Sequence, residues 1–224
     1  MAVDHLRRAA AHNGDNLWFQ LNYGRAALRC GCYREALAAF QRISGSKAAA
    51  GRDWLREAEK SLGQISRSTM ALARRAIADL AFEDGFEYLA IAEAVTADQT
   101  ETTDLRARLQ RRMYSHVSAL FRDQPDAAIG AIAAFVKLFP DNHKGLVMHG
   151  RSAMKHRDYA AALQSWQRAA QIAPDNAHYQ LQMARCLSWL KRPEACEAAN
   201  RALQLDPGLE EARQIVDQFV AAQN

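Results

Sequence analysis

The stretch HKGLVMHGRSAMKHRDYAAALQSWQRAAQIAPDN, residues 143–176, decides the fold of this chain. In its second half, Ala162 and Trp166 stand four residues apart, which places them on one face of a helix. Its first half carries Gly150 within another helical pattern, and Pro174 follows the second helix, where a proline is tolerated. Small residues at Gly150 and Ala162 let the two helices approach closely, and Trp166 fills the space between them. The stretch therefore predicts a closely packed pair of helices joined by a polar turn.

This pattern resembles the tetratricopeptide repeat, which has a period of about 34 residues. Counted from His143, the residues on consensus positions of that repeat are Gly150, Ala162, Trp166, Ala169 and Pro174. The aromatic residue usual a few positions after the glycine is replaced by Ala153. The resemblance implies an all-α fold, a right-handed α-solenoid of stacked helix pairs with capping helices.

The pattern recurs along the chain, so we expect one continuous array over residues 1–224. Clear units cover about residues 17–50, 143–176 and 177–209, and weaker units cover about residues 71–104 and 109–142. In the unit at 71–104, Glu83–Gly85 is expected to form the turn between the helices. An extra helix is expected at about 47–65, and a polar capping helix at 209–222. The register of the repeats between residues 47 and 108 stays open.

Composition sets limits on the class of protein. The chain has 224 residues, of which 49% are hydrophobic and 24% are charged, as in a soluble globular protein with a buried core. No run approaches twenty apolar residues, and the N-terminal segment lacks the apolar core of a secretory signal. We therefore expect a cytoplasmic protein without a membrane span. The net charge of +4 favours acidic partners.

Cys30-Gly31-Cys32 is the one cysteine pair close in sequence. The pair is compatible with a metal or redox site, or with two reduced cysteines, one of them packed. Zinc sites use a wider Cys-x2-4-Cys spacing with a second ligand pair, and the sequence has neither. The pair therefore favours reduced cysteines, which behave mostly as small apolar residues.

No catalytic constellation is present. The sequence contains none of the phosphate-binding-loop, HExxH, GxSxG or GxGxxG motifs. Its histidines are scattered, and none stands three or four residues from another alongside a carboxylate; they are His5, His12, His116, His143, His149, His156 and His178. We expect a protein that is not an enzyme, with no catalytic residue, no metal ligand and no cofactor.

The candidate site is a helix face. In the family that the chain resembles, the first helix of each unit lines the concave wall, with the second, fifth, ninth and twelfth positions exposed. The ninth position holds Arg25, Arg151 and Arg185 in the best units. The other residues expected at this wall are Trp18, Leu21, Asn22, Lys144, Val147, Lys155, His178, Leu181 and Trp189.

These residues combine guanidinium groups with apolar surface. Arginine presents a planar fork that suits a carboxylate, and apolar neighbours add burial. The face therefore suits an acidic, partly apolar peptide, helix or partner subunit. The alternative is that the arginines pair with glutamates of adjacent helices or are solvated. Some members of the family hold a carboxylate end with a lysine and two asparagines, and of these only Asn22 is present.

The leading hypothesis is a non-enzymatic scaffold or adaptor that binds a protein or peptide in its concave groove. The alternative is a regulatory or substrate-positioning subunit of a separate enzyme, such as a transferase. A third hypothesis, nucleic-acid binding, is disfavoured because 25 acidic residues nearly balance 29 basic ones and no lysine-rich stripe appears. Self-association stays open.

Overall fold

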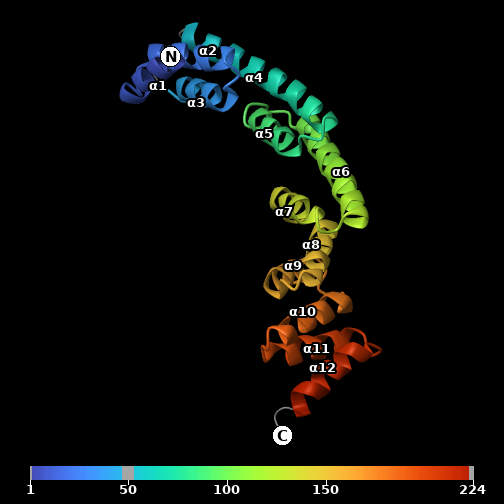
Figure 1. Cartoon of the computed structure of the whole chain (residues 1–224). Helices are drawn as coiled ribbons and strands as arrows, with labels where there is room; N and C mark the ends of the chain where they lie inside the picture. The colour runs from blue at the N-terminus through green and yellow to red at the C-terminus, as the bar shows by residue number, and fades with distance from the viewer. Residues whose placement is uncertain (1, 47–52, 222–224) are drawn as a thin grey trace. The chain divides into compact units, whose positions relative to one another are not determined.

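The structure, a computed structural model, describes residues 2–46 and 53–221. These residues form twelve α-helices, and none of them lies in a strand (Figure 1). The helices are α1 (Ala2–His12), α2 (Leu17–Arg29), α3 (Tyr33–Ser44), α4 (Asp53–Ala78), α5 (Phe82–Glu93), α6 (Thr100–Asp123), α7 (Ala128–Leu138), α8 (His143–Lys155), α9 (Tyr159–Ile172), α10 (Ala177–Trp189), α11 (Glu194–Leu205) and α12 (Glu210–Ala221). Within the described ranges, no helix has the length and apolar character needed to cross a membrane.

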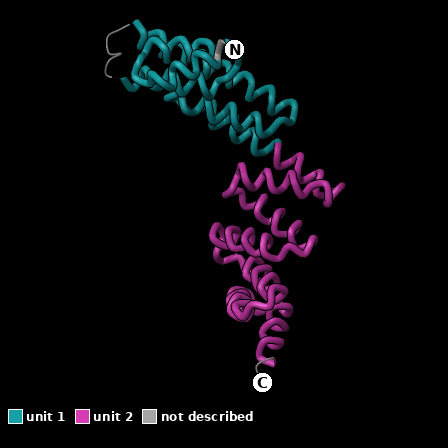
Figure 2. Tube along the Cα trace, turned by 60° about the vertical axis from the view of Figure 1, so that its left-hand side comes forward, with its two compact units in different colours: residues 1–112 teal, residues 113–224 magenta. Residues whose placement is uncertain are grey.

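Two compact units divide the chain at residue 112, within α6 (Figure 2). In residues 1–112, α2 pairs with α3 and α4 pairs with α5, while α1 packs on α2 and α3 packs on α4. In residues 113–224, α8 pairs with α9 and α10 pairs with α11, with α7 on α8 and α12 on α11. The all-α fold of successive helix pairs is thereby confirmed, whereas one continuous array over 1–224 stays a prediction.

Asparagine begins the first helix of the clear pairs. The side chain of Asn16 accepts a hydrogen bond from the amide of Trp18 at 3.1 Å, and that of Asn176 accepts one from His178 at 3.0 Å. Asn142 accepts one from Gly145 at 2.9 Å. Each bond satisfies an amide that the helix itself leaves without a partner, so these asparagines fix where the helices start.

Glycine against an aromatic ring sets the distance between paired helices. A β-carbon added to Gly150 in α8 would lie 2.6 Å from Cε2 of Trp166 in α9. One added to Gly24 in α2 would lie 2.8 Å from Cε1 of Phe40 in α3. Both rings are fully buried in the cores of their units. The predicted packing of Trp166 against Gly150 is confirmed.

The turns between paired helices share one conformation. Gly31, Leu80, Arg157 and Lys191 have positive φ angles of 73°, 61°, 61° and 55°. After each of them, the next amide donates to the carbonyl oxygen five residues earlier at 2.9 Å. This is the Schellman arrangement, in which a left-handed residue ends a helix and satisfies one of its last carbonyls. Arg157 and Lys191 are 34 residues apart, which is the period of the predicted repeat.

The prediction for the middle of unit 1 needs two corrections. Glu83–Gly85 does not form a turn but lies in the first turn of α5, where acidic residues favour a helix N-terminus. The turn is at Leu80 instead. Gly31 and Arg157, the left-handed residues of the units at 17–50 and 143–176, are each the fifteenth residue of their unit. If Leu80 is likewise the fifteenth, its unit covers 66–99 rather than 71–104.

The second correction concerns α4. The extra helix predicted at 47–65 and the first helix of the weaker unit are one helix, Asp53–Ala78. Gly63, Ser66 and Ser68 weaken the helix near the expected junction, but no proline stands there to end it, and α4 continues through. Residues 47–52 of this prediction lie outside the described residues.

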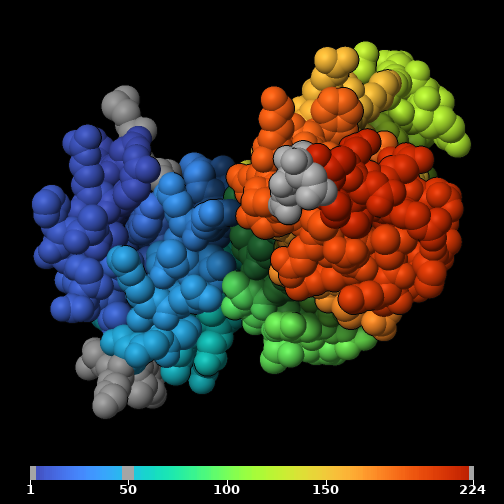
Figure 3. Space-filling model, turned by 90° about the horizontal axis from the view of Figure 1, so that it is seen from below, coloured from blue at the N-terminus to red at the C-terminus, as the bar shows by residue number. Residues whose placement is uncertain are grey.

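α12 covers Glu210–Ala221, within the range 209–222 predicted for the capping helix; residue 222 lies outside the described residues. Ala212 and Ile215 of α12 are buried on the rest of unit 2. The polar residues predicted for its outer side are all exposed: Glu210, Glu211, Arg213, Gln214 and Gln218. Figure 3 shows this end of unit 2, with α12 at the surface in red.

Candidate functional site

Two of the three predicted arginines are paired with glutamates. Arg25 in α2 lies 3.1 Å from a carboxylate oxygen of Glu57 in α4. Arg185 in α10 lies 3.0 Å from one of Glu211 in α12. Each pair joins successive first helices, as the alternative interpretation of the sequence expected. Since the side chains stay more than one-third exposed, these pairs contribute little to stability.

Arg151 in α8 differs from both. It is exposed, and within residues 2–46 and 53–221 its side chain makes no ion pair or hydrogen bond. The reason is visible in the repeat. Glu211, the partner of Arg185, is the second residue of α12, and the second residue of α10 is His178. The position that holds a carboxylate for Arg185 therefore holds an imidazole for Arg151.

His178 connects these residues on one face. Burial lowers the pKa of His178, the positive charges of Arg151 and Arg185 lower it further, and Glu211 opposes them. A lowered pKa leaves the imidazole neutral at pH 7. The four side chains come from α8, α10 and α12 and lie within electrostatic range of one another. We call them the α8–α10–α12 face: Arg151, His178, Arg185 and Glu211.

An aromatic cluster beneath this face holds α8 and α10 together. Tyr179 and His143 are hydrogen bonded through the phenol oxygen and Nε2, and their ring centroids are 5.3 Å apart. Tyr179 also stacks on Trp166 at 5.8 Å. Burial raises the pKa of Tyr179, so its phenol stays protonated at neutral pH. The sequence alone gave no indication of the bond between His143 and Tyr179, because it joins neighbouring repeats.

The predicted wall includes two residues that offer no surface. Leu21 is 6% exposed and Leu181 is 5% exposed, and both belong to the cores of their units. Each lies on the side of its helix that packs on the neighbouring pair, so these two leucines contribute to folding and not to a docking surface. Val147 is half-buried against the core of unit 2.

The remaining predicted residues are at the surface. Trp18 is 52% exposed, with its ring edge against Phe19, and Asn22 donates a hydrogen bond to the carbonyl oxygen of Trp18 at 2.8 Å. Lys144 is exposed. Lys155 lies 3.8 Å from a carboxylate oxygen of Asp126. Trp189, the last residue of α10, is 65% exposed, and its ring stacks on that of Tyr159.

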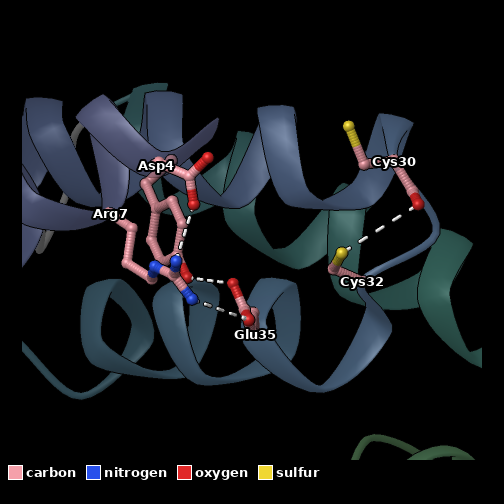
Figure 4. Close-up of polar contacts among 6 residues, drawn as sticks. Asp4, Arg7, Cys30, Cys32 and Glu35 are labelled. Atoms are coloured by element: carbon pink, nitrogen blue, oxygen red, sulfur yellow. Dashed lines mark hydrogen bonds and ion pairs between the residues drawn. The ribbon is translucent and has the colours of Figure 1, made fainter. Parts of the chain in front are cut away.

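In unit 1 a polar cluster ties α1, α2 and α3 together (Figure 4). Arg7 lies 2.6 Å from Asp4 and 3.7 Å from Glu35. The phenol of Tyr23 donates a hydrogen bond to Glu35, and burial together with this bond raises the pKa of Tyr23 to about 12. These partners satisfy one another, so the cluster is structural.

Cys30 and Cys32 are both exposed, which corrects the prediction that one of them is packed. The thiol of Cys32 lies 3.9 Å from the carbonyl oxygen of Cys30, across the turn at Gly31 (Figure 4). Among the described residues, no three histidines, cysteines or carboxylates lie close enough together to hold a metal ion.

No protein-family model matches the chain, and no curated protein matches it. Solved structures of TPR proteins are similar. The TPR domain of P58(IPK) is 13% identical, with a TM-score of 0.48 over 99% of this chain and 65% of that chain. YrrB, described as a TPR protein with an unusual peptide-binding site, is 14% identical, with a TM-score of 0.38 over 93% of this chain and 96% of that one.

A third similar structure is the TPR2AB domain of yeast Sti1 in a complex with pHSP90. It is 15% identical, with a TM-score of 0.40 over 100% of this chain and 91% of that chain. At such identities the likeness concerns the fold alone. The left-handed turns, the 34-residue period and the glycine–aromatic contacts come from the chain itself. Each of the two units is built from tetratricopeptide-like helix pairs.

Proposed function

We propose that this chain is a non-enzymatic protein-binding scaffold, and that the α8–α10–α12 face holds an acidic, partly apolar segment of its partner. One observation carries the proposal. Arg151 is an exposed guanidinium without a carboxylate partner among the described residues, on a face where the equivalent arginine is neutralised by Glu211. A carboxylate from another protein would supply the negative charge that His178, at the position equivalent to Glu211, does not supply.

The surroundings of Arg151 favour such a ligand. His178 is neutral at pH 7, so it does not compete for the carboxylate, and it can donate or accept one hydrogen bond. Val147, one turn before Arg151, adds apolar surface beside the charge. An arginine fork next to apolar surface binds a carboxylate bidentately and with less competition from water.

The paired arginines have a secondary role in this proposal. Arg25 and Arg185 would have to give up their glutamate partners to bind a carboxylate of the partner protein. This exchange adds little to the free energy of binding. Recognition therefore depends on Arg151 more than on the other two.

A selection from a phage-displayed random peptide library tests the proposal. We expect the chain to enrich peptides with Asp or Glu beside Leu, Ile or Phe, and Arg151→Glu to abolish that enrichment. Lys60→Glu is the matched control, because Lys60 is exposed in α4 and the change of charge is the same. If no acidic peptides are enriched, or if Arg151→Glu enriches them equally, the proposed face is wrong.

A further inference from the structure

Unit 2 has a second exposed surface, formed by the two turns that join its helix pairs. One turn leads from α8 to α9 and the other from α10 to α11. We call this surface the turn edge and define it by six residues: Lys155, Arg157, Tyr159, Trp189, Lys191 and Arg192. None of them has a role in the α8–α10–α12 face.

A pair of stacked rings joins the two turns. Tyr159 is the first residue of α9, and Trp189 is the last residue of α10. Their ring centroids are 5.4 Å apart and their planes differ by 4°. Tyr159 is anchored against the core of unit 2, while Trp189 is 65% exposed. The tyrosine therefore covers one face of the indole and leaves the other available as a flat stacking platform.

The same two turns also carry cations. Arg157, Lys191 and Arg192 are exposed, and their side chains make no ion pair or hydrogen bond with any other described residue. Lys155 forms an ion pair with Asp126, with 3.8 Å between Nζ and Oδ1. The carboxylates nearby are Asp126, Asp158 and Glu194: Asp158 caps α9 by accepting a hydrogen bond from the amide of Ala161 at 3.0 Å, and Glu194 lines the same hollow as Arg192. Four cations against these three carboxylates leave the turn edge with a net positive charge.

We propose that the turn edge binds single-stranded nucleic acid. A base stacks on the open face of Trp189, and the flanking phosphates pair with Arg157, Lys191 and Arg192. An aromatic ring stacks on any base, so this mode does not depend on sequence. A double helix offers no free base face, and the local positive charge repels a cationic ligand. A single indole lying flat on Tyr159 also has little apolar surface to insert into a membrane.

This arrangement is invisible in the amino-acid sequence. The cations occur in two short groups 34 residues apart, and neither forms a lysine-rich stripe. The repeat brings them to the same edge, because the left-handed turns at Arg157 and Lys191 are equivalent. The near balance of acidic and basic residues disfavours nucleic-acid binding when it is counted over the whole chain. That count does not reveal the positive charge gathered at the turn edge.

Fluorescence anisotropy with fluorescein-labelled 12-mers of oligo-dT and oligo-U tests the proposal. We expect Trp189→Ala to weaken binding about 5- to 150-fold, the range for loss of one stacked base. Trp189→Phe keeps a flat ring and should retain most of the affinity. Three phosphate contacts predict a slope of about −2 for the logarithm of affinity against that of salt concentration.

The cations are removed with Arg157→Gly, Lys191→Gly and Arg192→Gln together. Glycine suits the left-handed conformation, as Gly31 shows in unit 1, so the triple variant should stay folded. We expect it to lose the salt dependence. The control triple removes three exposed cations from unit 1: Arg8→Ala, Lys60→Ala and Arg108→Ala. An equal loss in both triples would mean that net charge alone drives binding, which overturns the proposal.

Competing ligands complete the test. Tighter binding to a 12-base-pair duplex, or to phosphatidylserine vesicles, than to the single strands would also overturn the proposal. So would unchanged binding by Trp189→Ala when circular dichroism shows a folded protein. Arg151→Glu should leave the affinity for single strands unchanged, so failure of this inference and failure of the proposed protein-binding face can be told apart.

Discussion

Gly150 and Trp166 are in such close contact that a methyl group on the glycine would stand 2.6 Å from Cε2 of the indole. No real β-carbon approaches an aromatic carbon this closely, and Trp166 has no space to move because it is fully buried. The contact fixes the distance between α8 and α9. It also orients the indole toward Tyr179, which stacks on it at 5.8 Å and carries the packing into the next helix pair.

Gly150→Ala is therefore expected to lower the free energy of unfolding by about 1–3 kcal/mol, the usual cost of overpacking a core. Gly130→Ala is the matched control. Gly130 is exposed within α7, and its added methyl would meet no atom within 4 Å, so this change should stabilise the protein by about 0.5–1 kcal/mol. Urea unfolding followed by circular dichroism measures both. Equal effects of the two variants would mean that the contact does not limit the approach of the helices.

The same contact explains how much of the fold could be predicted. A glycine, a tryptophan and a proline at fixed spacings mark residues 143–176, and each has a physical reason to be there. In the unit now placed at 66–99, Leu89 stands at the position equivalent to Trp166, and Leu80 occupies the left-handed position that Gly31 holds in the other turn of unit 1. Without those residues, helical periodicity predicts helices but not where the turn falls.

The candidate site was predictable only in part. Repeat positions identified Arg25, Arg151 and Arg185 as equivalent residues near the surface, but not their partners. Glu57 and Glu211 lie on later helices, so the pairing depends on how neighbouring repeats pack. That packing determines that Arg25 and Arg185 have glutamate partners and that Arg151 has none among the described residues. No local pattern in the sequence predicts this difference.

Gly31→Ala tests the conformation of the turns. A β-carbon at Gly31 would meet no atom within 4 Å, so the only cost is that of placing an L-residue at a φ of 73°. We expect a loss of about 1–2 kcal/mol in the free energy of unfolding. Gly14→Ala is the control, since it has equal space and no left-handed backbone, and it should be close to neutral. A neutral Gly31→Ala would contradict the left-handed turn. Urea unfolding measures both variants.

Protonation of His149 should destabilise the folded protein in mild acid. Burial lowers the pKa of its imidazole, and the charge of Asp158 only partly opposes this; its Nδ1 lies 2.6 Å from Oγ of Ser165. Because the folded pKa is below the unfolded value of about 6.5, the contribution of neutral His149 is complete above that pH. It is lost as the pH falls through the folded pKa.

The variant His149→Gln keeps a polar side chain but does not titrate. Its melting temperature should fall less than that of the wild type between pH 7.5 and pH 5. The measurement is thermal unfolding across this range in buffers of constant ionic strength. A parallel pH dependence in both proteins would show that protonation of His149 is not coupled to unfolding.

The protonation of His156 affects stability in the opposite direction, because the pKa of His156 is raised in the folded protein. Its Nδ1 lies 2.8 Å from the carbonyl oxygen of Ser152, and its Nε2 lies 3.0 Å from a carboxylate oxygen of Asp126. These two hydrogen bonds raise the pKa of His156, with the backbone carbonyl of Ser152 the larger cause. Its contribution to stability is therefore complete below the unfolded pKa of about 6.5 and is lost as the pH rises through the folded pKa.

Titration of the His156 ring by NMR measures this shift directly. Asp126→Asn removes the negative charge but keeps an oxygen acceptor, and should bring the pKa of His156 closer to 6.5 without restoring it fully, because the bond to Ser152 remains. An unchanged pKa in this variant would rule out the contact with Asp126.

The four cysteines should differ sharply in their reaction with a thiol reagent. Cys30 and Cys32 are exposed, Cys196 is half-buried, and Cys186 lies in the core of unit 2. Burial raises the pKa of Cys186 to about 11, and only the thiolate reacts, so at pH 8 about one molecule in a thousand is reactive even before access is considered. We expect two thiols to react fast in the native protein and Cys186 to react only when unit 2 unfolds.

The double variant Cys30→Ser and Cys32→Ser should lose the fast phase while keeping the reaction that follows unfolding in urea. A fast phase that survives in this variant would mean that Cys186 or Cys196 is accessible in the native state, contrary to the packing of α10 and α11 described above.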